Sequence, residues 1–492
     1  MNVLFITADQ WRADLQERAA ALGRPLENLA TLAREGTSFL DHYGQAQPCG
    51  PSRASLYTGL YAHKHRSVFN GAPLDRRHAT LFQQARATGY RPVLFGFTDT
   101  TLDTRGQFPA DPDCGNFENV APGLAVETLL TARATPWLAS LKAKNIPVPR
   151  PELGREGMFA QRALGDPPVF APEDSETAFL TDRFLRWLSV PECRPWFAHL
   201  SYIAPHPPFA AQARFRPNPR DVLEALAARP APPREIAPHP LVAALRATQT
   251  TRKSIPGLDM PVHALTLEQR ATVEACYVGL AAEVDHHLGR VFSALKLAGE
   301  WDHTMIVFTS DHGEQLFEHD LLGKSSFYDG GARVPLILRH PSPDFDAGRG
   351  ARLACFSEAV DLMPTLLNAL GAPAPANVDG YSLLPWCAGK TVPDWRDEVH
   401  WHCDFRALRP WFASQGSSLP ETGCSLQVIR SAGLKYVHFP YLPPALFDLR
   451  ADPGERENIA ARPEAATLLN EGMARMLDWR CKTEEHCDWT AA

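Results

Sequence analysis

Short apolar runs alternate with longer segments of helical patterning through most of the chain. Runs rich in β-branched and aromatic residues predict buried strands at residues 3–6, 92–95, 196–202, 304–309 and 334–338. Between them, apolar positions recur with helical spacing at residues 28–35, 177–188 and 267–297. This order predicts an α/β fold in which parallel strands are joined by crossover helices.

Beyond Pro373 the pattern changes to shorter strand-like pieces at residues 399–405, 426–431, 435–439 and 445–449. Short strands at close spacing are typical of a small antiparallel sheet. We therefore predict a large α/β domain over residues 1–375 and a smaller α+β domain over residues 376–492.

Two segments rich in proline and arginine, residues 130–175 and 205–265, have no clear pattern. They are too long to be simple connections. We expect them to form walls of a substrate pocket or arms of an oligomer.

Composition narrows the class of protein. The 492 residues are 45% hydrophobic, enough to bury one large core, and the net charge of -7 provides no basic field for nucleic acid. No apolar run approaches the roughly 20 residues that cross a bilayer, and the first residues lack a charged leader, so we expect neither a membrane partner nor export. Ten scattered cysteines then indicate reduced thiols in a cytoplasmic protein.

Chemically suggestive residues follow four of the predicted strands. Asp9 follows the first strand, Asp99 the second, His206 the third and Asp311 the fourth. Ligand-binding residues gather at the carboxyl ends of parallel strands. We therefore expect these four side chains to lie near one site.

The segment around Cys49 predicts an anion site. Pro51 suits the first turn of a helix and good helix formers follow, so Cys49 should lie at or just before a helix amino terminus. Such an end presents free N–H groups and positive potential to a sulfate or phosphate. Arg53, one turn later, can point back at Cys49 and at an anionic oxygen. The plainer alternative is a buried cysteine at an ordinary helix start.

A second pair of strand ends predicts a metal site. Asp9 and Gln10 follow the first strand, and Asp311-His312-Gly313 follows the fourth. Carboxylates at such positions are common cation ligands, and Gly313 would permit the backbone to turn beneath the ion. Taken singly, each motif is equally typical of a hydrogen-bonded turn or a cap.

Together these residues resemble the sulfatase branch of the alkaline phosphatase superfamily. The run from Cys49 through Pro51-Ser52-Arg53 to residues 58–59 is similar to the signal at which sulfatases convert a cysteine to Cα-formylglycine. Further matching pieces lie in the right order up to about Ala460, at residues 204–208, 324, 328–335, 361–365 and 446–458. The resemblance implies an alkaline-phosphatase-like fold, with a large, mostly parallel sheet flanked by helices and a smaller carboxy-terminal antiparallel-sheet domain.

The resemblance also implies two cofactors. The first is formylglycine formed from Cys49 by a formylglycine-generating maturation enzyme. The second is one divalent ion, for which Mn²⁺ or Ca²⁺ best matches a mixed nitrogen and oxygen donor set. Its implied ligands are Asp9, Gln10, Cys49, Asp311 and His312.

Other residues are implied around the substrate. Arg53, Lys324 and Asn70 would surround its anionic oxygens, where preorganised donors stabilise developing charge. His206 or Lys324 would protonate the leaving oxygen. Asp99 would be either the base that releases the product or a structural hydrogen-bond partner.

Departures from most sulfatases concern the substrate. Asp9-Gln10 stands where most have paired acidic residues, and Gly96-Phe97-Thr98-Asp99 stands where most have Lys-x-His. These features resemble the subgroup of phosphonate monoester hydrolases and related dimeric arylsulfatases, which implies a homodimer or homotetramer.

We predict a hydrolase of small sulfate monoesters that cleaves the S–O bond through a covalent hemiacetal intermediate. Phe97 supports this ranking because it lacks the hydroxyl that a tyrosine would offer a phosphonate. A phosphonate monoester or phosphodiester hydrolase using the same site is the alternative. A non-catalytic binding protein on the same scaffold is a third reading, which the complete set of expected metal ligands and Arg53 disfavours.

Overall fold

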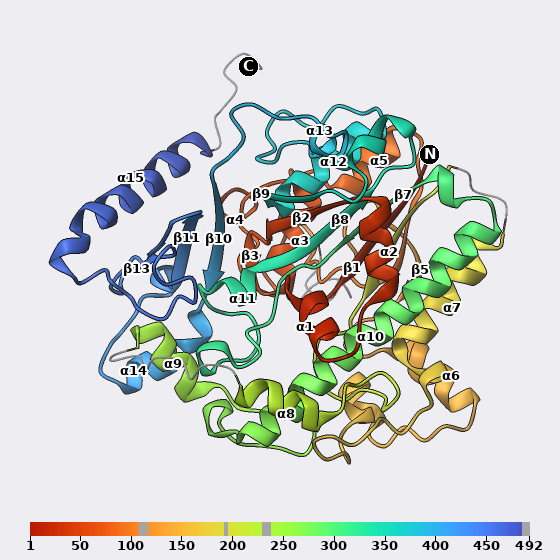
Figure 1. The fold of residues 1–492 in the computed structure, drawn as a ribbon, viewed down its shortest axis with the longest axis horizontal. Coiled ribbons are helices and arrows are strands. Elements are labelled where there is room, and N and C mark those ends of the chain that lie inside the picture. Colours follow the sequence, from red (N-terminus) through yellow and green to blue (C-terminus); the bar gives the residue numbers. More distant parts are fainter. Residues whose placement is uncertain (108–115, 117, 191–194, 229–237, 485–492) are drawn as a thin grey trace.

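The computed structural model describes residues 1–107, 116, 118–190, 195–228 and 238–484. Within them, eight strands form the main sheet in the order β5-β4-β6-β1-β7-β8-β2-β9. Their bounds are β1 (Asn2–Ala8), β2 (Thr37–Tyr43), β4 (Pro92–Gly96), β5 (Ala125–Leu129), β6 (Phe197–Tyr202), β7 (Thr304–Thr309), β8 (Arg333–Arg339) and β9 (Arg352–Glu358). This sheet, with helices packed around it, confirms the predicted α/β fold (Figure 1).

Strand direction departs from the prediction at one place. All five strands predicted before residue 340 are present, but β8 runs antiparallel to both of its neighbours, β7 and β2. The expectation that residues 334–338 join the parallel set was therefore wrong. A parallel return needs a crossover, usually a helix, whereas the connection from β7 to β8 holds no helix longer than the four residues of α11 (Asp329–Ala332).

The central strand β1 explains why helices cover both faces of the sheet. All seven of its residues are buried, and alternate side chains point to opposite faces. Leu4 and Ile6 enter the core formed with α1 (Leu15–Ala21), α2 (Glu27–Glu35), α7 (Glu176–Leu188) and α10 (Leu267–Leu297). Val3 and Phe5 enter the core formed with α3 (Cys49–Thr58), α5 (Leu81–Ala87) and α12 (Leu362–Ala369). Figure 1 shows the long helix α10 running beside α1 and α2.

The carboxy-terminal strands form a second sheet in the order β13-β12-β11-β10-β3. Its strands are β3 (Ala46–Gln47), β10 (Glu398–Asp404), β11 (Ser425–Ser431), β12 (Leu434–His438) and β13 (Ala445–Asp448), and α15 (Ala466–Lys482) packs on β12. The pairs from β10 to β13 are antiparallel, as predicted, while β3 joins β10 in parallel. Because β3 lies just before Cys49, the smaller sheet holds the segment that leads into α3. The domain division at residue 375 stays a prediction.

The two proline- and arginine-rich segments contain regular structure. Residues 130–175 include α6 (Thr135–Ala143), and residues 205–265 include α8 (Pro219–Ala227) and α9 (Pro240–Thr248). The densest proline run, residues 229–234, lies outside the described residues. The remaining short helices are α4 (Ala62–His65), α13 (Leu384–Cys387) and α14 (Arg409–Ser414). None of the described helices combines the length and apolar character needed to cross a membrane.

Candidate active site

The helix α3 begins at Cys49, where the sequence predicted a helix amino terminus. Its first turn contains Pro51, and it ends at Thr58, followed by Gly59, whose φ of 67° lies in the left-handed region that glycine adopts without strain. The Asn70 side chain caps the start of the helix, because its Oδ1 accepts the Gly50 N–H at 2.9 Å. Cys49 itself is only 5% exposed. The thiol is therefore held at a fixed position on a rigid element.

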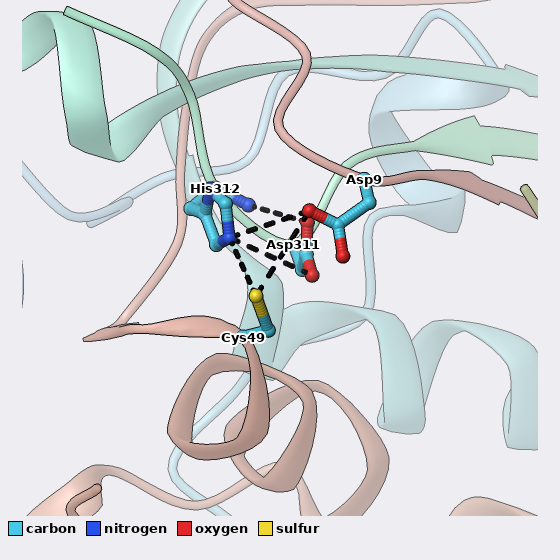
Figure 2. A group of neighbouring side chains, drawn as sticks. All are labelled: Asp9, Cys49, Asp311 and His312. Carbon is cyan, nitrogen blue, oxygen red and sulfur yellow. Dashed lines mark hydrogen bonds and ion pairs between the residues drawn. The ribbon is translucent and has the colours of Figure 1, made fainter. Parts of the chain in front are cut away.

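Two neighbouring strands bring the acidic residues to this thiol. β1 and β7 are parallel and in register, with Thr7 opposite Thr309, so the residues that follow them lie side by side. Asp9 comes from the end of β1, and Asp311 and His312 come from the end of β7. Figure 2 shows these three side chains converging on Cys49. One potential ligand atom from each of the four residues lies within 4.8 Å of the other three.

His312 faces the thiol as a neutral imidazole. Its Nδ1 donates to the Gly313 carbonyl oxygen at 3.0 Å, which leaves the lone pair of Nε2 to accept from Cys49 Sγ at 3.1 Å. Burial lowers the pKa of His312 to about 4. A neutral ring with Nε2 directed at two carboxylates has the form that binds metal ions.

Gly313 has a different role from the one predicted. The described glycines with positive φ do not include it, so its backbone needs no special conformation. A Cβ added there would lie 2.2 Å from the Gly330 carbonyl oxygen. Gly313 is thus required for the close approach of two backbone segments beneath the site.

Arg53 binds both carboxylates. Its Nε donates to Asp311 Oδ2 at 2.9 Å and its Nη2 pairs with Asp9 Oδ2 at 3.4 Å. Nη1 donates to Ser201 Oγ at 2.9 Å, and the guanidinium lies 4.1 Å from the centre of the Phe97 ring. Because these contacts occupy the guanidinium, its first effect is to hold the acidic pair in place. Contacts of Arg53 and Phe97 with a substrate stay predictions.

The acidic pair carries more negative charge than Arg53 balances. Asp9 and Asp311 are completely buried, and burial together with the charge of Asp311 raises the pKa of Asp9. Like charges held this close disfavour simultaneous ionisation unless a cation lies between them. The electrostatics of the pair therefore match a cation site.

Lys324 is positioned next to this cluster through Gln10. Its Nζ donates to Gln10 Oε1 at 2.8 Å. Burial alone would lower the pKa of Lys324, but the nearby Asp9 and Asp311 carboxylates raise it. Lys324 is therefore a charged ammonium directed at the acidic side of the site.

His206 lies in the turn after β6 and bonds to its own neighbour, since Nδ1 donates to the Pro207 carbonyl at 2.8 Å. Burial and the positive charge of Lys324 lower the pKa of His206 to about 3, so its ring is neutral. No hydrogen bond links this ring to the Cys49 cluster within the described part of the chain.

Asp99 follows β4 with a φ of 45°, an uncommon conformation for a residue other than glycine. Burial raises the pKa of Asp99 to about 7, with Asp9 and Asp311 adding to the effect and Arg53 opposing it. Its carboxylate makes no hydrogen bond or ion pair with another described residue. The structural hydrogen bond considered for Asp99 is therefore absent among these residues.

Two residues at the site were missed in the sequence. Ser201 binds Arg53 from the end of β6, and its only signal was a hydroxyl inside a predicted buried strand. Glu314 is completely buried and accepts the Gln10 Nε2 amide on its carboxylate. The signal for Glu314 was an acidic residue three positions after Asp311, beyond a buried strand.

Known proteins resemble this chain over nearly its whole length. The family model described as Sulfatase matches residues 1–372, and the one described as N-sulphoglucosamine sulphohydrolase, C-terminal, matches residues 317–482. The chain is 38% identical to the multifunctional alkaline phosphatase superfamily protein PehA of Trinickia caryophylli, over 99% of this chain and 96% of the relative. It is 26% identical to arylsulfatase K of Bos taurus, over 97% and 82% of the two chains. The chain is 36% identical in sequence to the phosphonate monoester hydrolase of Agrobacterium radiobacter. Its fold matches the crystal structure of that protein with a TM-score of 0.88, over 98% of this chain and 96% of the other.

Proposed function

The chain belongs to the sulfatase family, and we propose that this hydrolase cleaves sulfate monoesters with a formylglycine formed from Cys49. The observation that carries the proposal is the Cys49 thiol at the start of α3, facing two carboxylates and a neutral imidazole. In this reading Sγ marks the position of one hydroxyl oxygen of the hydrated aldehyde. The modification requires a formylglycine-generating enzyme as maturation partner.

The residues around Cys49 suit one divalent cation. Asp9, Asp311, His312 and residue 49 would hold it, with Gln10 as a further candidate. A bound ion would lower the pKa of a hydroxyl on residue 49 and so make it a nucleophile near neutral pH. The donors combine carboxylate oxygens with one imidazole nitrogen, so we propose Mn²⁺, with Ca²⁺ as the second choice.

In the first step, a hydroxyl of residue 49 would lose its proton to solvent, its oxygen would attack sulfur, and the S–O bond to the leaving alcohol would break. Arg53 and Lys324 supply the positive charge near the sulfate oxygens, and Asn70 holds the start of α3 that carries the nucleophile. The leaving oxygen takes up a proton. The raised pKa of Lys324 and the lowered pKa of His206 favour Lys324 as the donor, since it alone of the two is protonated at neutral pH.

In the second step, the hemiacetal sulfate on residue 49 breaks down. Its remaining hydroxyl loses a proton, the bond between carbon and the sulfate oxygen breaks, and sulfate leaves with the bonding electrons. The aldehyde forms again and water hydrates it. We propose Asp99 as the base, because its carboxylate has no partner among the described residues and ionises near neutral pH.

Phosphonate monoester hydrolysis is the second candidate. Phosphonate monoester hydrolases of Agrobacterium radiobacter and Silicibacter pomeroyi are both 36% identical to this chain with TM-scores of 0.88. Sulfate monoesters and phosphonate monoesters each carry one negative charge, so the same site can accept both. We rank sulfate first because Phe97 packs against Arg53 and offers no hydroxyl to a substrate.

A substrate panel tests this ranking. The values of kcat/KM are compared for an aryl sulfate, a phenyl phosphonate and a phosphodiester, with Cys49→Ala as the control for contaminating hydrolases. We expect the aryl sulfate to be preferred. A phosphonate preference above about a hundredfold, or roughly 2.7 kcal/mol of transition-state discrimination, would reverse the ranking.

Intact-protein mass spectrometry tests the modification. Conversion of the Cys49 thiol to an aldehyde lowers the mass by about 18 Da. If protein purified from the native host carries only the unmodified thiol, the proposed formylglycine nucleophile is wrong. Sedimentation of the same sample tests the proposed homodimer or homotetramer.

A further inference from the structure

The Gln10 backbone is fixed at the edge of the cation site. Its φ of 65° is uncommon outside glycine, and contacts on both sides hold it there. The Gln10 N–H donates to Asp311 Oδ1 at 3.2 Å, and the Tyr277 hydroxyl donates to the Gln10 carbonyl oxygen at 2.7 Å. The side chain is also buried, so the orientation of its amide is set by the two protein groups that hydrogen-bond to it.

Those groups leave only one orientation for the Gln10 amide. Nε2 donates to Glu314 Oε2, and Oε1 accepts from Lys324 Nζ at 2.8 Å. An ionised carboxylate can only accept hydrogen bonds and an ammonium can only donate them. A flipped amide would place its NH₂ group against the Lys324 ammonium and its oxygen against the carboxylate. The amide oxygen is thus directed at Lys324 by both contacts.

Glu314 is itself held as an acceptor. Its Oε1 accepts the backbone N–H of Leu316 at 2.9 Å and that of Gly323 at 2.5 Å, which leaves Oε2 for Gln10. Both carboxylate oxygens of Glu314 therefore accept from N–H groups, as an ionised carboxylate does. These three hydrogen bonds offset the cost of burying the Glu314 charge and hold the carboxylate in one orientation.

We propose that Glu314 is a positioning residue: it fixes the amide of Gln10 so that Oε1 faces Lys324, beside the Asp9, Asp311 and His312 cluster to which the Gln10 backbone N–H bonds. Resting on the proposed function, the inference is that this orientation presents an oxygen rather than an NH₂ group to a cation bound at the cluster. Glu314 would thereby act on the cation through Gln10 without being a ligand.

The variant Glu314→Gln separates this role from a general packing role. The carboxamide oxygen of the new side chain can still accept the Leu316 and Gly323 N–H groups, but its NH₂ then meets the NH₂ of Gln10. Relief of that clash flips Gln10 and turns its NH₂ toward Lys324. We expect Mn²⁺ titrated into metal-stripped protein to bind about 10- to 100-fold more weakly than to wild type, as for other outer-shell partners of metal ligands.

A charge-swapped double variant provides the rescue. In Gln10→Glu/Glu314→Gln, the amide of residue 314 donates to one carboxylate oxygen of residue 10, and the other oxygen faces Lys324. We expect Mn²⁺ affinity to return to the wild-type value or above it. The matched control is Glu318→Gln, which removes a carboxylate from the same connection that pairs with Arg12 and Arg18 instead. This control should lower the melting temperature without changing Mn²⁺ affinity.

Isothermal titration of the four proteins, with a thermal scan of each, decides the matter. Weak binding by Glu314→Gln together with recovery in the double variant supports the proposal. Equal binding by wild type and Glu314→Gln overturns it and leaves the proposed hydrolase intact, as does a double variant no better than the single one. Failure of wild type itself to bind Mn²⁺ or Ca²⁺ instead rejects the single-ion function, and this inference with it.

Discussion

Replacement of Arg53 by methionine tests how the acidic pair is held. Methionine keeps apolar volume beside Phe97 but removes the charge that bonds to Asp311 and Asp9. Arg53 is only 1% exposed, so water cannot replace it without rearrangement. The variant therefore leaves two buried carboxylates to face each other.

The magnitude follows from the geometry. The candidate ligand oxygens of Asp9 and Asp311 lie within 4.8 Å, and two unit charges at that separation repel by about 3.5 kcal/mol at an effective dielectric constant of roughly 20. Removing one partner of a buried ion pair commonly costs about 3–5 kcal/mol. We expect the free energy of unfolding to fall by about 3–4 kcal/mol in metal-free protein at mildly alkaline pH.

Urea unfolding followed by tryptophan fluorescence measures this loss. The loss should be smaller in Mn²⁺ than in chelator, because the cation takes over the neutralising charge of Arg53. The control Ser201→Ala removes a neutral hydrogen bond from the same guanidinium and should cost only about 1 kcal/mol. Equal unfolding free energies for Arg53→Met and wild type in chelator would refute the view that Arg53 holds the acidic pair.

Further predictions concern Asp99, Lys324 and the proposed cation. The folded pKa of Asp99, about 7, lies above its ordinary 3.8, so the native state binds the extra proton and stability should fall as pH rises between these values; Asp99→Asn should flatten that fall in urea titrations, and an unchanged slope would contradict the assignment. If Asp99 is the base, Asp99→Asn also removes the rise of kcat through neutral pH, which pH–rate profiles would show. Lys324→Met should lower kcat by about 10²–10⁴-fold and exceed the effect of His206→Ala; the reverse order in steady-state kinetics would assign the proton donor to His206. Chelation should abolish hydrolysis and Mn²⁺ should restore it, whereas activity that survives exhaustive dialysis against chelator would exclude the single-ion site.

Much of this architecture could be predicted because buried strands and helices leave simple patterns of apolar residues in the sequence. The strand β7 matches its predicted bounds, since a run of apolar β-branched residues between polar turns has few other structures. The long helix α10 matches as well, because a capping box at Thr266 marks its start and helical spacing continues to its end. The direction of β8 could not be predicted, because direction depends on what fills the connection and not on the strand itself.

The candidate site also combines features that the sequence predicts with features that it does not. The proximity of Asp9, Cys49, Asp311 and His312 was predictable, since each follows a strand or begins a helix whose end reaches one edge of the sheet. The partner of each polar group was not. Arg53 turned out to bind the carboxylates, and Glu314 received a contact from Gln10, because hydrogen-bond pairing is decided by side-chain geometry across segments 258 and 304 residues apart.

The charges around Cys49 argue that this residue does not work as a thiol. Catalytic cysteines act as thiolates, and their surroundings lower the pKa of the sulfur. Here burial and the Asp9 carboxylate raise the pKa of the Cys49 thiol well above its ordinary value, although Lys324 lies close enough to oppose them. The protein therefore keeps an unmodified thiol protonated and unreactive. The hydrated aldehyde proposed for this position would present hydroxyl groups instead, and the carboxylates that suppress a thiolate would then serve as ligands of the cation proposed to activate a hydroxyl. The proposed modification of Cys49 would thus account both for the acidic surroundings and for a nucleophile at a helix start.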